Sequence, residues 1–408
     1  MDVVVTLTGP SAVRSPYEWR GIMADTVPTE QALKQTRGFR WGEVPPTRER
    51  RLAALAAPAD PDLGGIAGFI GTFSGTGLNT IFRPQDFAVT PTPLPNPATG
   101  PNDNILEINL TEETLSFSAA LGSIPNRGMV QGDAFLNGIP YLQTINDVSV
   151  PANPVGIHFE PGVWLSVPAT TVPKEDATIV RMASIPHGTT IDAQGASFTV
   201  AGGPRIDPVD ITPFPIGNPG HRIKFSSQTA TDTATFRLPQ DLTDFIAAGT
   251  ITQEILDNPN IILKKRADAQ NITSTTVNVI STNPADPLFG GGTDNIAFLL
   301  GDKNVTTPNA DAVQMSATFW IETVTEQITV PAYTADQPVI VQGATSAGNP
   351  VVSFSVTSQS PTAEDTTIDV SYTQIQYTQT VLLNFNRLTW PHVSVATLVP
   401  NEPVPVAI

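Results

Sequence analysis

The feature that most limits what this chain can fold into is the alternation of short β-prone runs with turn residues. Beyond residue 60, runs rich in Val, Ile, Thr and Phe, such as Thr178–Met182 and Thr275–Ile280, are separated by Pro, Gly, Asn and Asp. β-branched and aromatic side chains pack well on a pleated surface, and the separating residues favour turns. The pattern predicts an all-β fold of many short antiparallel strands.

The chain also repeats short elements of its own sequence at a constant offset. In four pairs of matching elements, the second member lies 156 residues after the first. A segment of 156 residues is about the size of one small barrel. We therefore predict an internal duplication, with one β-barrel or sandwich at 61–216 and a second at 217–408. A single enlarged barrel built from two half-sequences is the alternative. The matches are Phe69 with Phe225, Asn104-Ile105 with Asn260-Ile261, Trp164 with Trp320, and Ser197-Phe198 with Ser353-Phe354.

Helical patterns occur in two places only. Residues 1–60 form an N-terminal extension in which Thr29–Lys34 and Thr47–Ala56 are the best helix candidates, because each opens on a threonine that can cap a helix. A further helix is expected between Pro239 and Asp257, where apolar residues recur at helical spacing. The sequence thus predicts a partly helical extension attached to an all-β body.

Composition excludes several classes of function. The formal net charge is −17, so the surface would repel phosphates and a nucleic-acid partner is not expected. The absence of cysteine excludes disulfides and thiolate metal sites. No apolar run reaches the ~18 residues of a membrane span, and the first residues lack a basic signal-peptide region. We expect a cytoplasmic protein without a membrane partner, and the sequence leaves its oligomeric state open.

Histidine is scarce enough for every copy to be considered. The chain has four: His158, His187, His221 and His392. Their spacing matches no zinc or di-iron motif, and no nucleophile elbow or phosphate-binding loop is present. Any imidazole chemistry must therefore use one of these four residues.

The most informative histidine is His392, which follows a proline in a strand-like run. Alternation along a strand places His392, Ser394 and Ala396 on one face. Two small side chains after an imidazole leave a gap, and a flat ligand such as a porphyrin needs that arrangement. A structural or surface histidine is the simpler alternative.

A second candidate cluster contains His158, Trp164 and His187. A turn leads into the strand that carries Trp164, and His187 follows in a Pro-His-Gly turn between two strand-like runs. The simplest interpretation is a hairpin with an aromatic core residue. Strand ends at the mouth of a barrel are also where ligand sites occur, so His187 is a candidate functional residue.

Taken together and in order, four segments resemble the motifs of the nitrobindin-like haem-binding β-barrels. The glycine-rich run at 71–77 resembles the opening strand of that family. The turns at 160–164 and 185–188 are similar to two of its internal motifs, and 392–398 is similar to its C-terminal strand.

The resemblance implies a ten-stranded antiparallel barrel of the calycin type with a haem at its open end. It also implies chemistry of ferric haem with peroxide or reactive nitrogen species. On this basis His392 is the expected axial ligand of the iron, and Trp164, Ser394 and Ala396 are the expected neighbours of the haem. His187 is the catalytic candidate for the opposite side of the pocket.

Two other functions remain open from the sequence. The duplication also resembles tandem calycin proteins, among them cyclases and hydratases, which would bind or transform an apolar small molecule without a metal, with Glu160 or Glu322 as proton donor. A structural or interaction role without catalysis is the third possibility. In the metal-free alternative, the aromatic residues expected to line the cavity are Trp164, Phe319, Trp320 and Trp390.

Overall fold

All described residues belong to one compact unit, Pro58–Ile408, of a computed structural model. The expected N-terminal extension at 1–60, with both of its helix candidates, lies outside the described residues. The described residues are 61–85, 94, 104–283, 291–301, 309–333, 337–344, 350–358, 360–361 and 363–408.

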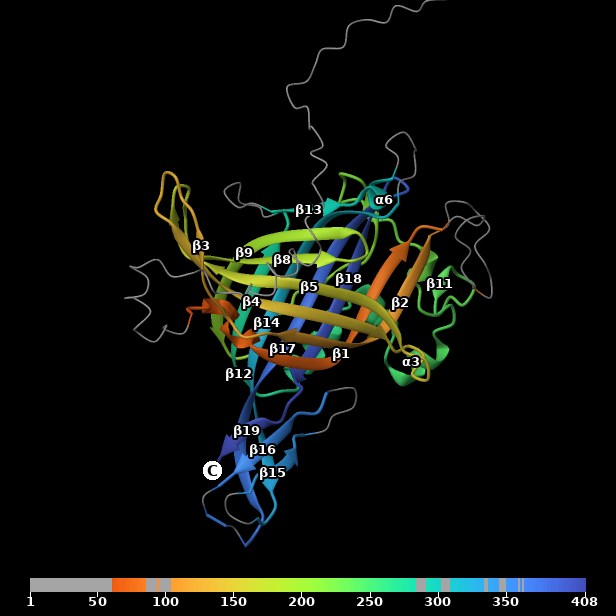
Figure 1. Ribbon diagram of the computed structural model, residues 1–408. Coiled ribbons are helices and arrows are strands. Elements are labelled where there is room, and N and C mark those ends of the chain that lie inside the picture. The colour runs from red at the N-terminus through yellow and green to blue at the C-terminus, as the bar shows by residue number, and fades with distance from the viewer. Residues whose placement is uncertain are drawn as a thin grey trace, which may run out of the picture. The chain divides into compact units, whose positions relative to one another are not determined.

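Ten strands from the described residues form one closed antiparallel barrel, which confirms the β class of the fold (Figure 1). These strands are β1 (Gly71–Arg83), β2 (Ile105–Phe117), β4 (Ala134–Asp147), β5 (Val155–Val167), β8 (Thr178–Ile185), β9 (Thr189–Ala201), β12 (Ile272–Ser281), β14 (Asp311–Val330), β17 (Thr366–Phe385) and β18 (Leu388–Pro400).

The barrel closes through the pairing of its first strand with its last and through a second pairing that passes over β3 (Leu121–Asn126). Strand β1 pairs with β18, with Gly77 opposite Ala396. Strand β2 pairs with β4, with Phe117 opposite Tyr141. The ring of strands runs β1, β18, β17, β14, β12, β9, β8, β5, β4 and β2, and β2 pairs again with β1.

A second barrel is not shown in the described part of the chain. Residues 61–216 contribute six strands and 217–408 contribute four strands to the same barrel. The matched sequence elements also adopt different structures, because Asn104-Ile105 leads into β2 whereas Asn260-Ile261 leads into a helix. The observed arrangement is the single barrel built from both half-sequences.

The strands are longer than the runs that predicted them. β14 and β17 each contain 20 residues, whereas the β-prone runs of the sequence within them, Gln327–Val330 and Thr367–Tyr372, cover only one end of each. The remaining parts carry polar side chains such as Gln374 and Gln376, which are buried. Hydrogen bonds from Gln374 to Glu322 and from Gln376 to the Leu263 carbonyl accommodate these polar residues in the barrel wall.

Aromatic side chains fill part of the barrel interior. A short 3-10 helix, η1 (Gly64–Phe69), precedes β1 and places Phe69 against Phe117, with ring centroids 4.7 Å apart. The Phe69 ring also lies 5.0 Å from Trp164 and 5.8 Å from Phe319. These rings are buried and form a packed region inside the barrel.

A helical segment covers the outer side of β17 and β18. The helix expected at Pro239–Asp257 is present as two short helices, because Gly249 adopts a left-handed conformation with φ 72° and ends the first. The backbone carbonyl of Leu263 accepts a hydrogen bond from Gln376 Nε2 on β17 at 3.2 Å. The helices of this segment are η2 (Ser226–Gln228), α3 (Thr243–Ala248), α4 (Gln253–Asp257) and α5 (Ile261–Asp268).

A small sheet lies beyond the barrel, against the ends of β14 and β17 (Figure 1). Its three strands share a separate apolar core in which Phe354 and Val330 are fully buried. No helix among the described residues has the length and apolar character required to cross a bilayer. The remaining elements are β3 (Leu121–Asn126), β6 (Thr170–Thr171), β7 (Lys174–Glu175), β10 (Phe214–Pro215), β11 (Arg237–Leu238), β13 (Gly292–Asn295), α6 (Ala297–Leu300), β15 (Val339–Gln342), β16 (Ser353–Thr357) and β19 (Val404–Ala407).

Candidate functional site

The part of the barrel not filled by aromatic rings contains a cavity of about 400 Å³. Side chains from β1, β2, β4, β5, β8, β9, β14, β17 and β18 and from α6 (Ala297–Leu300) line it, so the cavity lies inside the barrel. Much of the lining is aliphatic, including Ile81, Ile145, Ile185, Val381 and Leu383. Its volume and lining are those of a small-molecule site.

Three of the four histidines of the chain line this cavity. His158 is on β5, His187 is in the turn between β8 and β9, and His392 is on β18. The rings of His158 and His187 are close, with centroids 5.5 Å apart. The barrel therefore brings together imidazoles that are up to 234 positions apart in the sequence.

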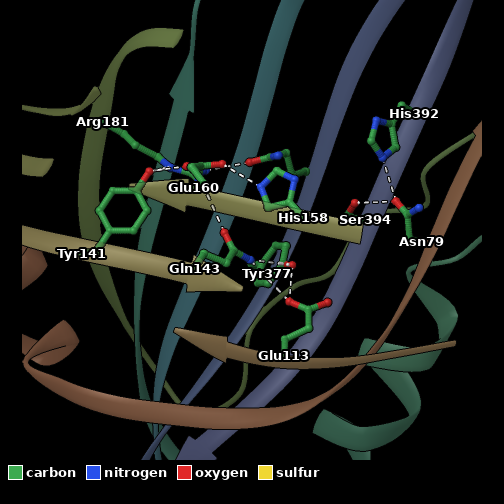
Figure 2. Close-up of polar contacts among 11 residues, drawn as sticks. Asn79, Glu113, Tyr141, Gln143, His158, Glu160, Arg181, Tyr377, His392 and Ser394 are labelled. Carbon is green, nitrogen blue, oxygen red and sulfur yellow. Dashed lines mark hydrogen bonds and ion pairs between the residues drawn. The ribbon is translucent and has the colours of Figure 1, made fainter. Parts of the chain in front are cut away.

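The side chain of Asn79 orients His392. Asn79 Oδ1 lies 2.7 Å from His392 Nε2 and also accepts a hydrogen bond from Ser394 Oγ at 2.9 Å (Figure 2). Asn79 Nδ2 donates to Asn109 Oδ1 at 3.0 Å, which identifies the Asn79 atom facing His392 as its oxygen. His392 therefore donates from Nε2, and its Nδ1 carries the lone pair.

Two of the three cavity imidazoles are electrically neutral near pH 7. Burial, with smaller contributions from His158 and His187, lowers the pKa of His392 to about 3. Burial and the proximity of His158 also lower the pKa of His187. A neutral imidazole in an apolar wall can accept a hydrogen bond or ligate a metal, because its lone pair is not protonated.

A buried ion pair lies next to His158. Arg181 Nη2 is 2.5 Å from Glu160 Oε1, and the two side chains are 1% and 0% exposed. Glu160 Oε2 lies 3.1 Å from His158 Nε2, and Tyr141 donates its hydroxyl to Glu160 Oε1. Burial raises the pKa of Glu160, but the Arg181 charge and the hydrogen bonds outweigh it and hold the pKa at about 2.

A second buried carboxyl, that of Glu113, lies on β2. Tyr377 donates its hydroxyl to Glu113 Oε2 at 2.5 Å, and Gln143 Nε2 donates to the Tyr377 hydroxyl at 3.1 Å (Figure 2). Burial raises the pKa of Glu113 despite these hydrogen bonds. Burial also raises the pKa of Tyr377, so the phenol stays protonated. Gln143 and Tyr377 form part of the cavity wall.

The structure brings together three of the residues selected from the sequence. His392, Ser394 and His187 line the cavity. Ala396 and Trp164 are not among the lining residues. Ala396 faces Gly77 across the β1–β18 pairing and is fully buried, and Trp164 is packed against Phe69.

The residues expected for a metal-free apolar site do not meet at the cavity. Trp320, Trp390, Phe319 and Glu322 are buried but are not lining residues. Glu322 accepts a hydrogen bond from Gln374 on the neighbouring strand instead. Glu160 is close to the cavity, but its low pKa makes it a carboxylate rather than a proton donor.

Several residues of the site were not selected from the sequence. His158 was part of a cluster but had no assigned role, and Arg181, Asn79 and Tyr377 were not considered. The two-residue spacing of His158 and Glu160 on a strand places both on one face, which could have signalled their pairing. The contacts of Arg181 and Tyr377 depend on strands that meet only in the folded barrel.

Among the described residues, no group of three or more His, Asp and Glu side chains could hold a metal ion. Comparisons with protein-family models, with curated proteins and with solved structures found no match for this chain.

Proposed function

We propose that this protein binds haem in the barrel cavity, with His392 as the ligand of the iron. The observation that carries the proposal is the position of His392, a neutral imidazole in a largely aliphatic cavity wall. The small neighbour Ser394 leaves space beside the ring. We also propose a calycin-type, nitrobindin-like fold, with which a closed barrel of ten antiparallel strands is consistent, and a cytoplasmic location.

The residues present fit a singly ligated haem. Histidine ligands of metals usually donate the other ring N–H to a carbonyl or carboxylate, which fixes the tautomer. Asn79 Oδ1 supplies that acceptor for His392 Nε2 and leaves Nδ1 as the atom with a lone pair. Bound haem would supply an iron site for reactions with peroxide or reactive nitrogen species.

His187 and His158 provide the polar groups on another part of the cavity wall. Their rings are 5.5 Å apart, and the Glu160 carboxylate accepts a hydrogen bond from His158. We propose that His187, with its lowered pKa, accepts a proton from a small molecule bound in the cavity. His158 and Glu160 would orient that part of the wall.

The test is reconstitution of the purified protein with hemin and measurement of its visible spectrum. We expect a Soret band that is lost in His392→Ala and retained in the matched variant His221→Ala, because His221 is exposed and is not a lining residue. An unchanged Soret band in His392→Ala would remove His392 as the iron ligand. Failure of the wild type to bind hemin would remove the proposal.

A second candidate function is the binding of an apolar molecule without metal. It is favoured by the aliphatic lining of the cavity and by the hydrogen bond that already occupies His392 Nε2. In this case the colourless protein would bind a neutral hydrophobic dye, and hemin would not displace the dye. Displacement by hemin with appearance of a Soret band would favour haem instead.

A further inference from the structure

One buried pair of opposite charges beside the cavity is neutralised within the protein. The Arg181 guanidinium and the Glu160 carboxylate are 2.5 Å apart and fully enclosed. Arg181 is not itself a lining residue. Its Nη1 donates at 2.6 Å to Oε1 of Gln379, which does line the cavity. Its Nε donates to the Tyr141 hydroxyl at 2.8 Å.

The guanidinium is therefore already occupied. Each of its nitrogen atoms donates to a protein oxygen: Nε to Tyr141, Nη1 to Gln379 and Nη2 to Glu160. Rings of Trp164 and Tyr141 lie 5.8 and 5.4 Å from its central carbon and cover its faces. Arg181 cannot serve as the counter-charge of an anionic ligand unless Glu160 releases it.

One imidazole of the cavity presents a hydrogen-bond acceptor. His392 Nε2 donates to Asn79 Oδ1, so the lone pair of this neutral imidazole lies on Nδ1. Because Glu160 is ionised, its contact with His158 Nε2 requires that nitrogen to donate. A ligand group that donates a hydrogen bond matches the acceptor on His392, whereas a carboxylate can only accept.

We propose that the cavity selects molecules whose buried end is uncharged and donates a hydrogen bond, such as the hydroxyl of a long-chain alcohol, and that the Arg181–Glu160 pair excludes carboxylates. The inference rests on the second candidate function, the binding of an apolar molecule in the cavity. A buried carboxylate would lose its hydration without gaining a counter-charge, and it would add a negative charge near Glu160.

The experiment compares three ligands of equal chain length with the wild-type protein at pH 8. Nile red is bound first and is then displaced by dodecanol, dodecanoate or dodecyl methyl ether. We expect dodecanol to bind at least ~10-fold more tightly than dodecanoate, and more tightly than the ether, which lacks the donor. Equal or tighter binding of dodecanoate, or no displacement by dodecanol, would overturn the inference.

A charge variant tests the role of the ion pair. Glu160→Gln leaves the Arg181 guanidinium without its carboxylate, so the ratio of dodecanoate to dodecanol affinity should rise ~10-fold. The control Glu160→Gln/Arg181→Met has neither charge and should keep the preference for dodecanol. An unchanged ratio in folded Glu160→Gln would overturn the role of the pair. If Glu160→Gln does not fold, the wild-type preference for dodecanol over dodecanoate and the same preference in the double variant still test the inference.

The outcome is separate from the test of haem binding. Absence of a Soret band would remove the haem proposal and leave the preference for alcohols to be measured with Nile red. Conversely, a Soret band that depends on His392 together with tight binding of dodecanoate would retain the haem proposal and remove this inference.

Discussion

Asn79 and His392 form a fixed pair across the β1–β18 contact of the barrel. Their side chains are joined at 2.7 Å between Oδ1 and Nε2, and the amide of Asn79 is in turn held by Asn109. The pair determines which imidazole nitrogen of His392 keeps its lone pair. Asn79 on the first strand of the barrel therefore sets the tautomer of His392 on the last strand.

Replacing Asn79 with Leu should destabilise the protein by about 1–3 kcal/mol, because the His392 N–H and the Asn109 amide would each lose a buried partner. Urea unfolding measures the change. Ser394→Ala is the milder control, since it removes a donor to the Asn79 oxygen without leaving His392 unpaired. Equal losses in the two variants would contradict this account.

Acid should destabilise the fold through His392. Its pKa of about 3 in the folded state lies below its ordinary value of 6.5, so the unfolded state binds more protons between these values. Stability is therefore complete above pH 6.5 and falls as the pH drops towards 3, by up to about 1.4 kcal/mol per pH unit. Urea midpoints between pH 7 and pH 5 should fall less steeply in His392→Gln, and parallel slopes would contradict the prediction.

Removing one member of the buried ion pair should lower the free energy of unfolding far more than removing both members. Arg181→Met leaves the Glu160 carboxylate without its partner and should cost about 3–5 kcal/mol of unfolding free energy. The Glu160→Gln/Arg181→Met variant should recover most of that loss. Denaturation of both single variants and the double variant gives the coupling, and a coupling near zero would argue against the pair.

Glu322 should make the protein less stable above neutral pH. Burial raises its pKa from 4.5 to about 7, although hydrogen bonding to Gln374 opposes this. The folded state binds its proton more tightly, so stability decreases as the pH rises from 4.5 to 7. Glu322→Gln should therefore be about 2–3 kcal/mol more stable than wild type at pH 8 and nearly equal at pH 4. Glu112→Gln, an exposed control, should show no such difference.

The close approach of β1 and β18 should make Gly77 intolerant of substitution. A Cβ at this position would lie 2.2 Å from the Val395 carbonyl oxygen and 2.9 Å from the Ala396 Cβ. Gly77→Ala should lower the free energy of unfolding by about 1–3 kcal/mol, because the backbone of β1 or β18 must move to make room for the Cβ. Gly122→Ala, which meets no atom within 4 Å, should change stability by less than about 0.5 kcal/mol. Thermal unfolding of the two variants makes the comparison.

The β class followed from the sequence because alternation and turn residues are local signals. Every predicted run lies in or overlaps a strand, as Thr178–Met182 does in β8. The β-prone runs of the sequence are shorter than β14 and β17, because polar residues interrupt the pattern of β-branched and aromatic residues inside these two strands. The expected pair of barrels was not observed, since residue matches such as Asn104-Ile105 and Asn260-Ile261 carry no information on which strands pair.

The candidate site was predictable only in part. Alternation placed His392, Ser394 and Ala396 on one face, and the first two do line the cavity. Ala396 does not: it is fully buried between Gly77 on β1 and Tyr377 on β17, its partners in the two adjacent strands. Arg181 and Tyr377 could not be assigned from the sequence, because their roles depend on hydrogen bonds to residues 21 and 264 positions away.

The sequence by itself determined the β character of the body, the absence of thiol chemistry and the shared strand face of His392 and Ser394, since these follow from residue type and strand periodicity. The tertiary structure decided that both halves close into one barrel and that three histidines share one cavity. It also decided that Arg181 is neutralised before any ligand arrives. These features depend on contacts between distant strands, whose register is set by packing across the whole barrel rather than by neighbours in the chain.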